Sequence, residues 1–170
     1  MLGNTTRNMD SIAFTIPKEK DASVHIIING RDLIETLRDI ELPFATREDH
    51  PRIAGTYSGL PAHRVFFPSR HFLGEPEPIY SDGEGRTYVL ECECGEPGCW
   101  PFAVRIELQE RDVIWRDFKQ EHRGPHAKAG EWRYDALPSF RFDRANYEQA
   151  LSGQRYMAQQ EVAGAMHPNK

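Results

Sequence analysis

The sequence predicts an α+β domain in which a mainly antiparallel sheet packs against one or two helices. Three observations support this fold class. Apolar and polar residues alternate in three segments between about 87 and 119, separated by turn-forming residues, which is typical of a meander. A β-branched run at 24–28 leads into helical spacing at 31–40. A second apolar stripe at helical spacing follows residue 143.

The first half of the chain begins with two predicted strands. Ile12, Phe14 and Ile16 alternate with small or polar residues, and Pro17 ends this run. Residues 24–28 form a run typical of a buried strand.

The helix predicted over 31–40 places Leu33, Leu37 and Ile40 on one face. Asp32 lies near its N-terminal end, where a carboxylate is favoured. Pro43 is expected to prevent its continuation.

Residues 43–86 are predicted to be irregular, because prolines and glycines punctuate them, with short strands near 53–57 and 64–67. The basic and aromatic stretch from His63 to His71 is interpreted as a packed loop in preference to a nucleic-acid surface.

The meander is predicted over 87–94, 101–108 and 112–119. Cys92 and Cys94 fall on its apolar face. Pairing residues 92 and 94 with 104 and 102 would keep the neighbouring glutamates turned outward, because a slip of one residue inverts the faces.

After a predicted loop at 122–139, residues 140–142 lead into the last predicted helix. Asp143 is its expected N-cap, and Tyr147 and Leu151 belong to its apolar stripe.

Length and composition predict one domain over 11–160, with polar tails at 1–10 and 161–170. The 21 Lys and Arg residues against 26 Asp and Glu residues give a net charge of −5, which argues against nucleic-acid or anionic-membrane binding and favours a polypeptide partner. No apolar run reaches the roughly 20 residues of a membrane span, and no apolar leader begins the chain, so a cytoplasmic location is expected.

All three cysteines, Cys92, Cys94 and Cys99, fall in one C-x-C-x4-C segment at the predicted hairpin tip. Three interpretations stay open. The cysteines could be small structural residues, ligands of a metal such as Zn²⁺, or redox-active or nucleophilic thiols. Acidic neighbours and the absence of Lys and Arg between residues 86 and 105 argue against the third, since negative charge raises a thiol pKa. A bound divalent cation would supply the missing positive charge.

Topology offers a fourth ligand. The strand at 112–119 runs in the same direction as the strand at 87–94, so its end is expected beside the cysteine hairpin. His122 or His126 follows directly and is the candidate fourth ligand.

The segment from Cys92 to Pro101, with 30–33, 115–118 and 140–143, resembles a family of small uncharacterised bacterial proteins with a C-x-C-G-x-x-G-C-W-P segment. This resemblance spans about residues 24–151 and implies a bacterial cytosolic protein without implying an activity. The cysteine spacing is also similar to the zinc-binding post-SET segment of lysine methyltransferases. That likeness covers eight residues and implies a capacity for zinc only, because the chain has no fourth cysteine and no SET-domain motif.

The sequence contains no Ser-His-Asp, G-x-S-x-G, H-E-x-x-H or dinucleotide-binding signature. A non-enzymatic protein-binding or regulatory domain, whose hairpin could hold a structural zinc, is therefore the leading hypothesis. The alternative is a zinc-dependent, hydrolase-like enzyme in which Glu91, Glu93, Glu96 or His122 serves as acid or base.

Overall fold

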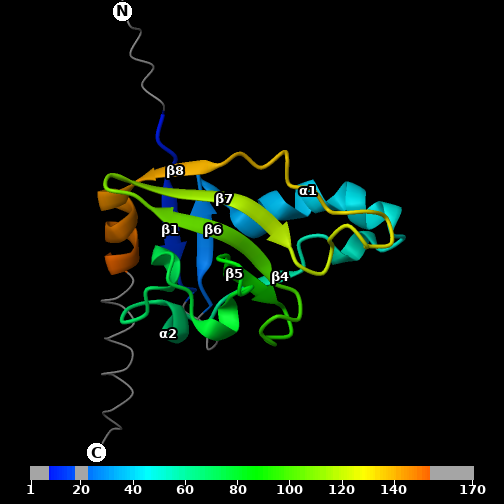
Figure 1. Cartoon of the computed structure of the whole chain (residues 1–170), viewed down its shortest axis with the longest axis horizontal. Coiled ribbons are helices and arrows are strands. Elements are labelled where there is room, and N and C mark those ends of the chain that lie inside the picture. The colour runs from blue at the N-terminus through cyan, green and yellow to red at the C-terminus, as the bar shows by residue number, and fades with distance from the viewer. Residues whose placement is uncertain (1–7, 18–22, 154–170) are drawn as a thin grey trace, which may run out of the picture.

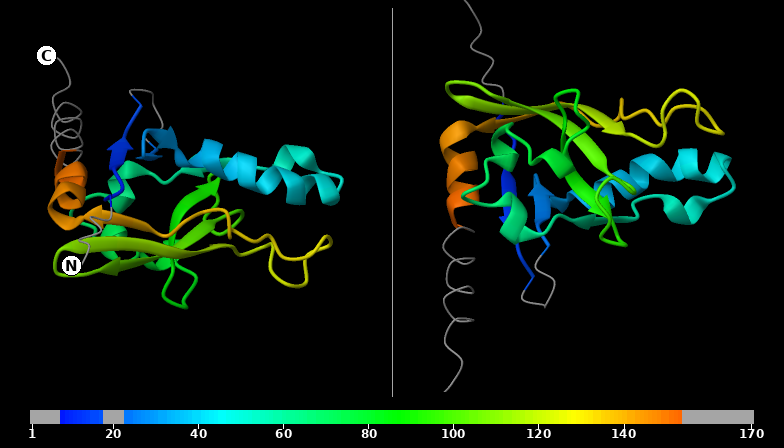
Figure 2. Two further views of the ribbon diagram at one scale, coloured as in Figure 1. Left: turned by 90° about the horizontal axis from the view of Figure 1, so that it is seen from above. Right: turned by 60° about the horizontal axis from the view of Figure 1, so that its bottom comes forward.

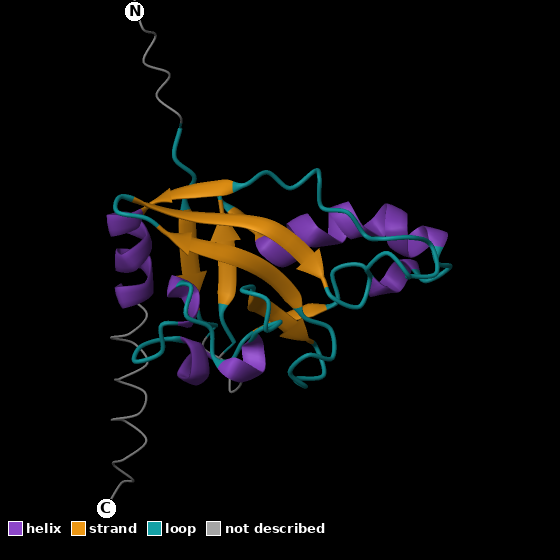
Figure 3. Ribbon diagram, viewed as in Figure 1, coloured by secondary structure: helices purple, strands orange, loops and turns teal. Residues whose placement is uncertain are grey.

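A computed structural model describes residues 8–17 and 23–153. It confirms the α+β class, with a five-stranded sheet in the order β4-β5-β6-β7-β8 and a three-stranded sheet in the order β1-β2-β3, and every pairing between these strands is antiparallel (Figures 1 and 3). The strands are β1 (Ile12–Thr15), β2 (His25–Ile28), β3 (Arg31–Asp32), β4 (Tyr57–Gly59), β5 (Thr87–Cys92), β6 (Phe102–Leu108), β7 (Asp112–Gln120) and β8 (Phe140–Asp143). The helices are α1 (Leu33–Arg47), α2 (Ala62–Val65), the 3₁₀ turns Pro51–Ile53, His71–Leu73 and Pro78–Tyr80, and a helix described over 144–153.

The curved five-stranded sheet forms one layer, and the three-stranded sheet with α1 forms the other (Figure 2). One hydrophobic core lies between them, with Phe14, Leu37, Phe102 and Trp115 each at most 2% exposed. Within the described part of the chain, no helix is long and apolar enough to cross a membrane. The tails expected at 1–10 and 161–170 lie largely outside the described residues.

Helix α1 begins as the sequence predicts and ends later. The Asp32 carboxylate accepts a hydrogen bond from the Ile34 amide at 2.8 Å and caps the first turn. The expectation that Pro43 prevents continuation is wrong, because α1 runs to Arg47 with Pro43 inside it. Pro43 is exposed, so the carbonyl that loses its partner can bond to water, while the buried Ala45 holds the last turn on the core.

The predicted pairing of residues 92 and 94 with 104 and 102 is also wrong. Leu90 pairs with Phe102 across a bulge, and Cys92 pairs with Tyr57 of β4. Four residues of β5 in succession, from Tyr88 to Glu91, are at most 6% exposed, so the strand is buried on both faces. Alternation of faces therefore cannot fix its register.

In the second half of β7 a bulge changes which side chains face the core, and the loop that follows the strand lies beside the cysteine hairpin. Val113 and Trp115 are fully buried, but Asp117 adopts a left-handed backbone (φ 59°) near a shift in the pairing of β6 with β7. After this bulge Gln120 is buried at the strand end. The connection that follows lies beside the β5–β6 connection, at the end of the sheet away from the 144–153 helix (Figure 1).

Three shorter elements complete the comparison. The strand expected near 64–67 is wrong, because residues 62–65 form α2. The strand expected near 53–57 is displaced, since β4 spans Tyr57–Gly59. The cap of the last helix is confirmed, because Asp143 accepts a hydrogen bond from the Asn146 amide at 3.0 Å.

Candidate metal centre

The β5–β6 connection curls because its glycines permit two tight turns. Gly95 and Gly98 both have left-handed backbones, with φ of 79° and 76°. The Gly95 amide donates to the Cys92 carbonyl at 2.9 Å, and the Cys99 amide donates to the Glu96 carbonyl at 3.2 Å. These turns bring Cys99 back toward the end of β5.

The three sulfur atoms converge as a result. The Sγ atoms of Cys92, Cys94 and Cys99 all lie within 4.8 Å of one another. All three cysteines are free; Cys92 is half-buried, and the other two are exposed. Zinc–thiolate bonds of about 2.3 Å in a tetrahedron place sulfurs about 3.8 Å apart, so a small contraction would bring this triad to ligating geometry. The group can therefore hold a metal ion.

The thiols also perturb one another. Hydrogen bonding to Cys92, helped by the Glu96 backbone, lowers the pKa of Cys94 below its usual value. Hydrogen bonding to Cys92 and Cys94 raises the pKa of Cys99 to about 11. The expectation that acidic neighbours raise every thiol pKa therefore fails for Cys94, because contacts between the sulfurs outweigh the effect of Glu96. Cys94 therefore loses its proton before Cys99 does, and a metal that binds the triad must displace the protons that remain.

The nearby glutamates divide between the two sides of the sheet. Glu91 directly precedes Cys92 in β5, so the two side chains project to opposite faces. Burial raises the pKa of Glu91 to about 7, an effect that Arg64 partly offsets, and its Oε2 has no hydrogen-bond partner. Glu93 and Glu96 are exposed on the hairpin.

His122 lies beside the hairpin, which confirms the placement predicted from topology. Its Nε2 is 2.7 Å from the Gly98 carbonyl oxygen, and its ring stacks on Trp100 with centroids 6.3 Å apart. Neither His122 nor His126 belongs to the group of mutually close ligand atoms, which among the described residues consists of the three cysteines. A metal-ligating role for either histidine stays a prediction.

A buried ionic and aromatic contact network, which sequence reasoning missed, holds this loop on α1. Glu48, 2% exposed at the end of α1, accepts hydrogen bonds from Arg123 Nε and Trp132 Nε1, both at 3.0 Å. The Arg123 guanidinium lies 4.7 Å from the Trp100 ring centroid and 5.6 Å from that of Trp132. This network thus connects the cysteine hairpin to α1 through His122, Trp100, Arg123, Trp132 and Glu48.

A second buried cluster lies about two turns earlier on the same face of α1. Glu41 is fully buried and accepts hydrogen bonds from the Gly55 amide at 2.8 Å, Tyr57 at 2.5 Å and Tyr134 at 2.8 Å. Burial raises the pKa of Glu41 against the opposing effect of these donors. The signal available in the sequence was the position of Glu41 and Glu48, seven residues apart on the face of α1 that carries its apolar stripe.

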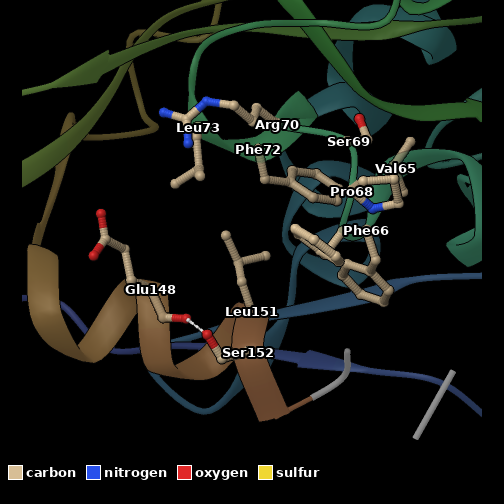
Figure 4. Close-up of a pocket in the computed structure, with 11 residues that line it drawn as sticks. Val65, Phe66, Pro68, Ser69, Arg70, Phe72, Leu73, Glu148, Leu151 and Ser152 are labelled. Atoms are coloured by element: carbon tan, nitrogen blue, oxygen red, sulfur yellow. Dashed lines mark hydrogen bonds between the residues drawn. The ribbon is translucent and has the colours of Figure 1, made fainter. Parts of the chain in front are cut away.

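The basic and aromatic stretch packs on the core in part, because Phe66 and His71 are at most 3% exposed whereas Phe67 is 53% exposed. Beside it lies a cavity of about 360 Å³ (Figure 4). Its apolar wall consists of Val65, Phe66, Phe67, Pro68, Phe72, Leu73 and Leu151. Its charged residues already have partners, since Arg70 pairs with Glu75 and Glu148 pairs with Arg144. No lining residue belongs to the cysteine hairpin, so this cavity is separate from the candidate metal centre.

The chain matches no family model, no curated protein and no solved structure. The resemblances noted from the sequence therefore stay predictions, and what the site can do follows from its own residues.

Proposed function

We propose that this protein is a non-enzymatic, protein-binding module whose cysteine hairpin holds one Zn²⁺ through Cys92, Cys94 and Cys99. The observation that carries the proposal is the convergence of three free thiols within 4.8 Å of one another. Thiolates are soft donors that zinc prefers, and the positive charge of the metal would offset most of the charge of the three thiolates that it binds. The prediction of a cytoplasmic location belongs to this proposal, because thiols remain reduced in that compartment.

The zinc-dependent hydrolase is the weaker hypothesis. The ligand sets of catalytic zinc usually contain histidine and no more than two thiolates, as in His₃, His₂Glu and Cys₂His sites. Three thiolates give the zinc complex a net charge of −1, which disfavours further loss of a proton from bound water. Among the acid and base candidates, Glu91 turns to the opposite face of β5, and Glu93 and Glu96 are exposed to bulk water.

Metal analysis after purification without chelator tests the zinc site. We expect one zinc per chain in the wild type and less than about 0.1 in Cys92→Ser/Cys99→Ser. Glu93→Gln is the matched control, because it removes a charge from the same hairpin without removing a thiol. Labelling of the thiols should be slow in the zinc-loaded protein and fast after unfolding in chelator. A wild type that contains less than about 0.1 zinc per chain would refute the proposal.

The protein-binding role needs its own test. Tagged protein expressed at its native level should recover a reproducible partner, and Cys94→Ser should recover less of it when its expression matches the wild type. Failure of the wild type to recover any reproducible partner would contradict a protein-binding role and leave the zinc site unaffected.

A further inference from the structure

The described part of the chain supplies three of the four ligands that a tetrahedral zinc requires, and the fourth decides what the site does. We infer that this fourth position accepts the imidazole of a histidine on a partner polypeptide, one whose flanking residues are basic. The inference rests on the proposed function, since it concerns the same zinc site.

His122, one of the two candidates named from the sequence, already makes other contacts. A carbonyl oxygen can only accept, so Nε2, at 2.7 Å from the Gly98 oxygen, carries the proton of the neutral ring. Nε2 therefore cannot ligate a metal in this tautomer, and Nδ1, which keeps its lone pair, does not lie close enough to the three sulfurs to join their group. Neither ring nitrogen belongs to the group of ligand atoms within 4.8 Å of one another.

The backbone and the neighbours of His122 hold the ring where it is. The His122 amide donates to Gln120 Oε1 at 2.7 Å, and Gln120 is 1% exposed. The next residue, Arg123, is fixed by Glu48 and by the Trp100 ring, the same ring on which His122 stacks. Turning the imidazole toward the sulfurs would break both its hydrogen bond and its stacking contact. His122 is therefore a positioning residue that holds the Gly98–Cys99 turn.

The site faces outward, where a partner can reach it. Cys94 and Cys99 are exposed, and no histidine nitrogen or carboxylate oxygen of the described residues joins the sulfur group. A zinc ion with three thiolates carries a net charge of −1, and the exposed Glu93 and Glu96 add to it. A neutral imidazole flanked by basic residues complements this charge, whereas a fourth thiolate would add to the negative charge.

Cobalt spectroscopy on tag-free full-length protein tests the inference, with imidazole itself as the probe. Cobalt(II) bound through thiolates gives charge-transfer and d–d absorption bands that report its ligands. We expect imidazole to shift the d–d bands of the wild type saturably, and acetate at equal concentration to leave them unchanged. His126→Ala and His167→Ala, the latter outside the described residues, should respond to imidazole as the wild type does. His122→Ala loosens the Gly98–Cys99 turn and changes the starting spectrum, but its bands should still shift with imidazole.

The alternatives give distinct results. If the wild-type bands ignore imidazole, and one of the three histidine variants both changes the starting spectrum and gains the response, that histidine is the fourth ligand and the inference is wrong. A wild type that binds one cobalt per two chains shares its metal between copies, which also overturns it. A wild type without thiolate-to-cobalt bands refutes the proposed function itself, and the two failures are therefore distinguishable.

Discussion

His71 is the only histidine among the described residues that is fully buried, and its titration gives a measurable signature of the fold. Its Nε2 donates to the Tyr88 carbonyl at 2.7 Å, and its Nδ1 accepts from the Glu77 amide at 3.1 Å. Both bonds require the neutral ring with the proton on Nε2. Burial lowers the pKa of His71 to about 4, against the smaller opposing effects of Tyr88 and Glu77.

The sign of the effect follows from the two states. An unfolded histidine has a pKa of about 6.5, so as the pH falls through this value the unfolded chain binds a proton that the folded chain does not. The stability that His71 contributes is complete above the unfolded pKa and is lost as the pH falls toward 4. For these two pKa values, linkage predicts that the free energy of unfolding decreases by about 2 kcal/mol between pH 7 and pH 5.

Glu91 opposes this trend and must be removed to reveal it. Because burial raises the pKa of Glu91 to about 7, the folded state binds this proton first, and stability rises as the pH falls from there. We therefore predict a flattened pH profile for the wild type and the full decrease in Glu91→Gln. The additional variant His71→Gln removes the titrating ring.

Urea unfolding at about pH 7 and about pH 5 measures the difference, with reductant and chelator present so that no metal contributes. Glu91→Gln should lose about 2 kcal/mol more than Glu91→Gln/His71→Gln over this range, whatever the double variant has lost at neutral pH. Equal losses in the two proteins would refute the reasoning.

Two further substitutions test the packing with matched controls. Gly59→Ala places a Cβ atom 2.1 Å from the Val24 carbonyl oxygen and should lower the free energy of unfolding by about 3 kcal/mol or more. Its control is Gly124→Ala, whose Cβ atom meets nothing within 4 Å and which should change the free energy of unfolding by about 0.5 kcal/mol or less. Similar urea midpoints for the two would contradict the close contact. Arg123→Lys removes a planar guanidinium that contacts two tryptophan rings and a carboxylate, so it should lower the free energy of unfolding by about 1–3 kcal/mol and change the near-ultraviolet circular dichroism. Its control is Arg133→Lys, in an exposed ion pair, which should lower the free energy of unfolding by about 0.5 kcal/mol or less. Equal costs would show that the stacking contributes nothing.

The parts of the fold that could be predicted are those in which local pattern and final environment agree. Alternation in β6, where Phe102, Val104 and Ile106 are buried, gave the meander. Its register could not be predicted, because Tyr57 in the three-residue β4 is the partner of Cys92 and leaves almost no periodic signal. The left-handed backbone of Asp117 likewise changes which side chains of β7 face the core, and no glycine in the sequence marks this position.

In the candidate metal centre, too, the contacts that arise from local sequence could be predicted and the long-range contacts could not. The sulfur triad follows from local turns, and the approach of His122 follows from strand direction, so both could be expected from the sequence. Glu48 and Arg123 lie 75 positions apart, and no local pattern connects them. Charged residues on a helix usually face solvent, so the sequence gives no reason to expect that Glu48 is buried.

These contacts together indicate that the fold does not depend on the metal. Pairing with Tyr57 fixes Cys92 in the sheet, and the hydrogen bond between His122 and the Gly98 carbonyl fixes the turn that carries Cys99. Two of the three thiols are thus positioned by elements anchored to the core, and only Cys94 depends on the hairpin alone. Small zinc domains that lack such a core unfold without metal, because binding must supply their folding free energy. Here a core spanning both sheets supplies it, so folding would not need the free energy of a metal bound at the cysteine triad. A metal at this exposed loop would therefore be free to serve the partner binding proposed above, because the fold would stand without it.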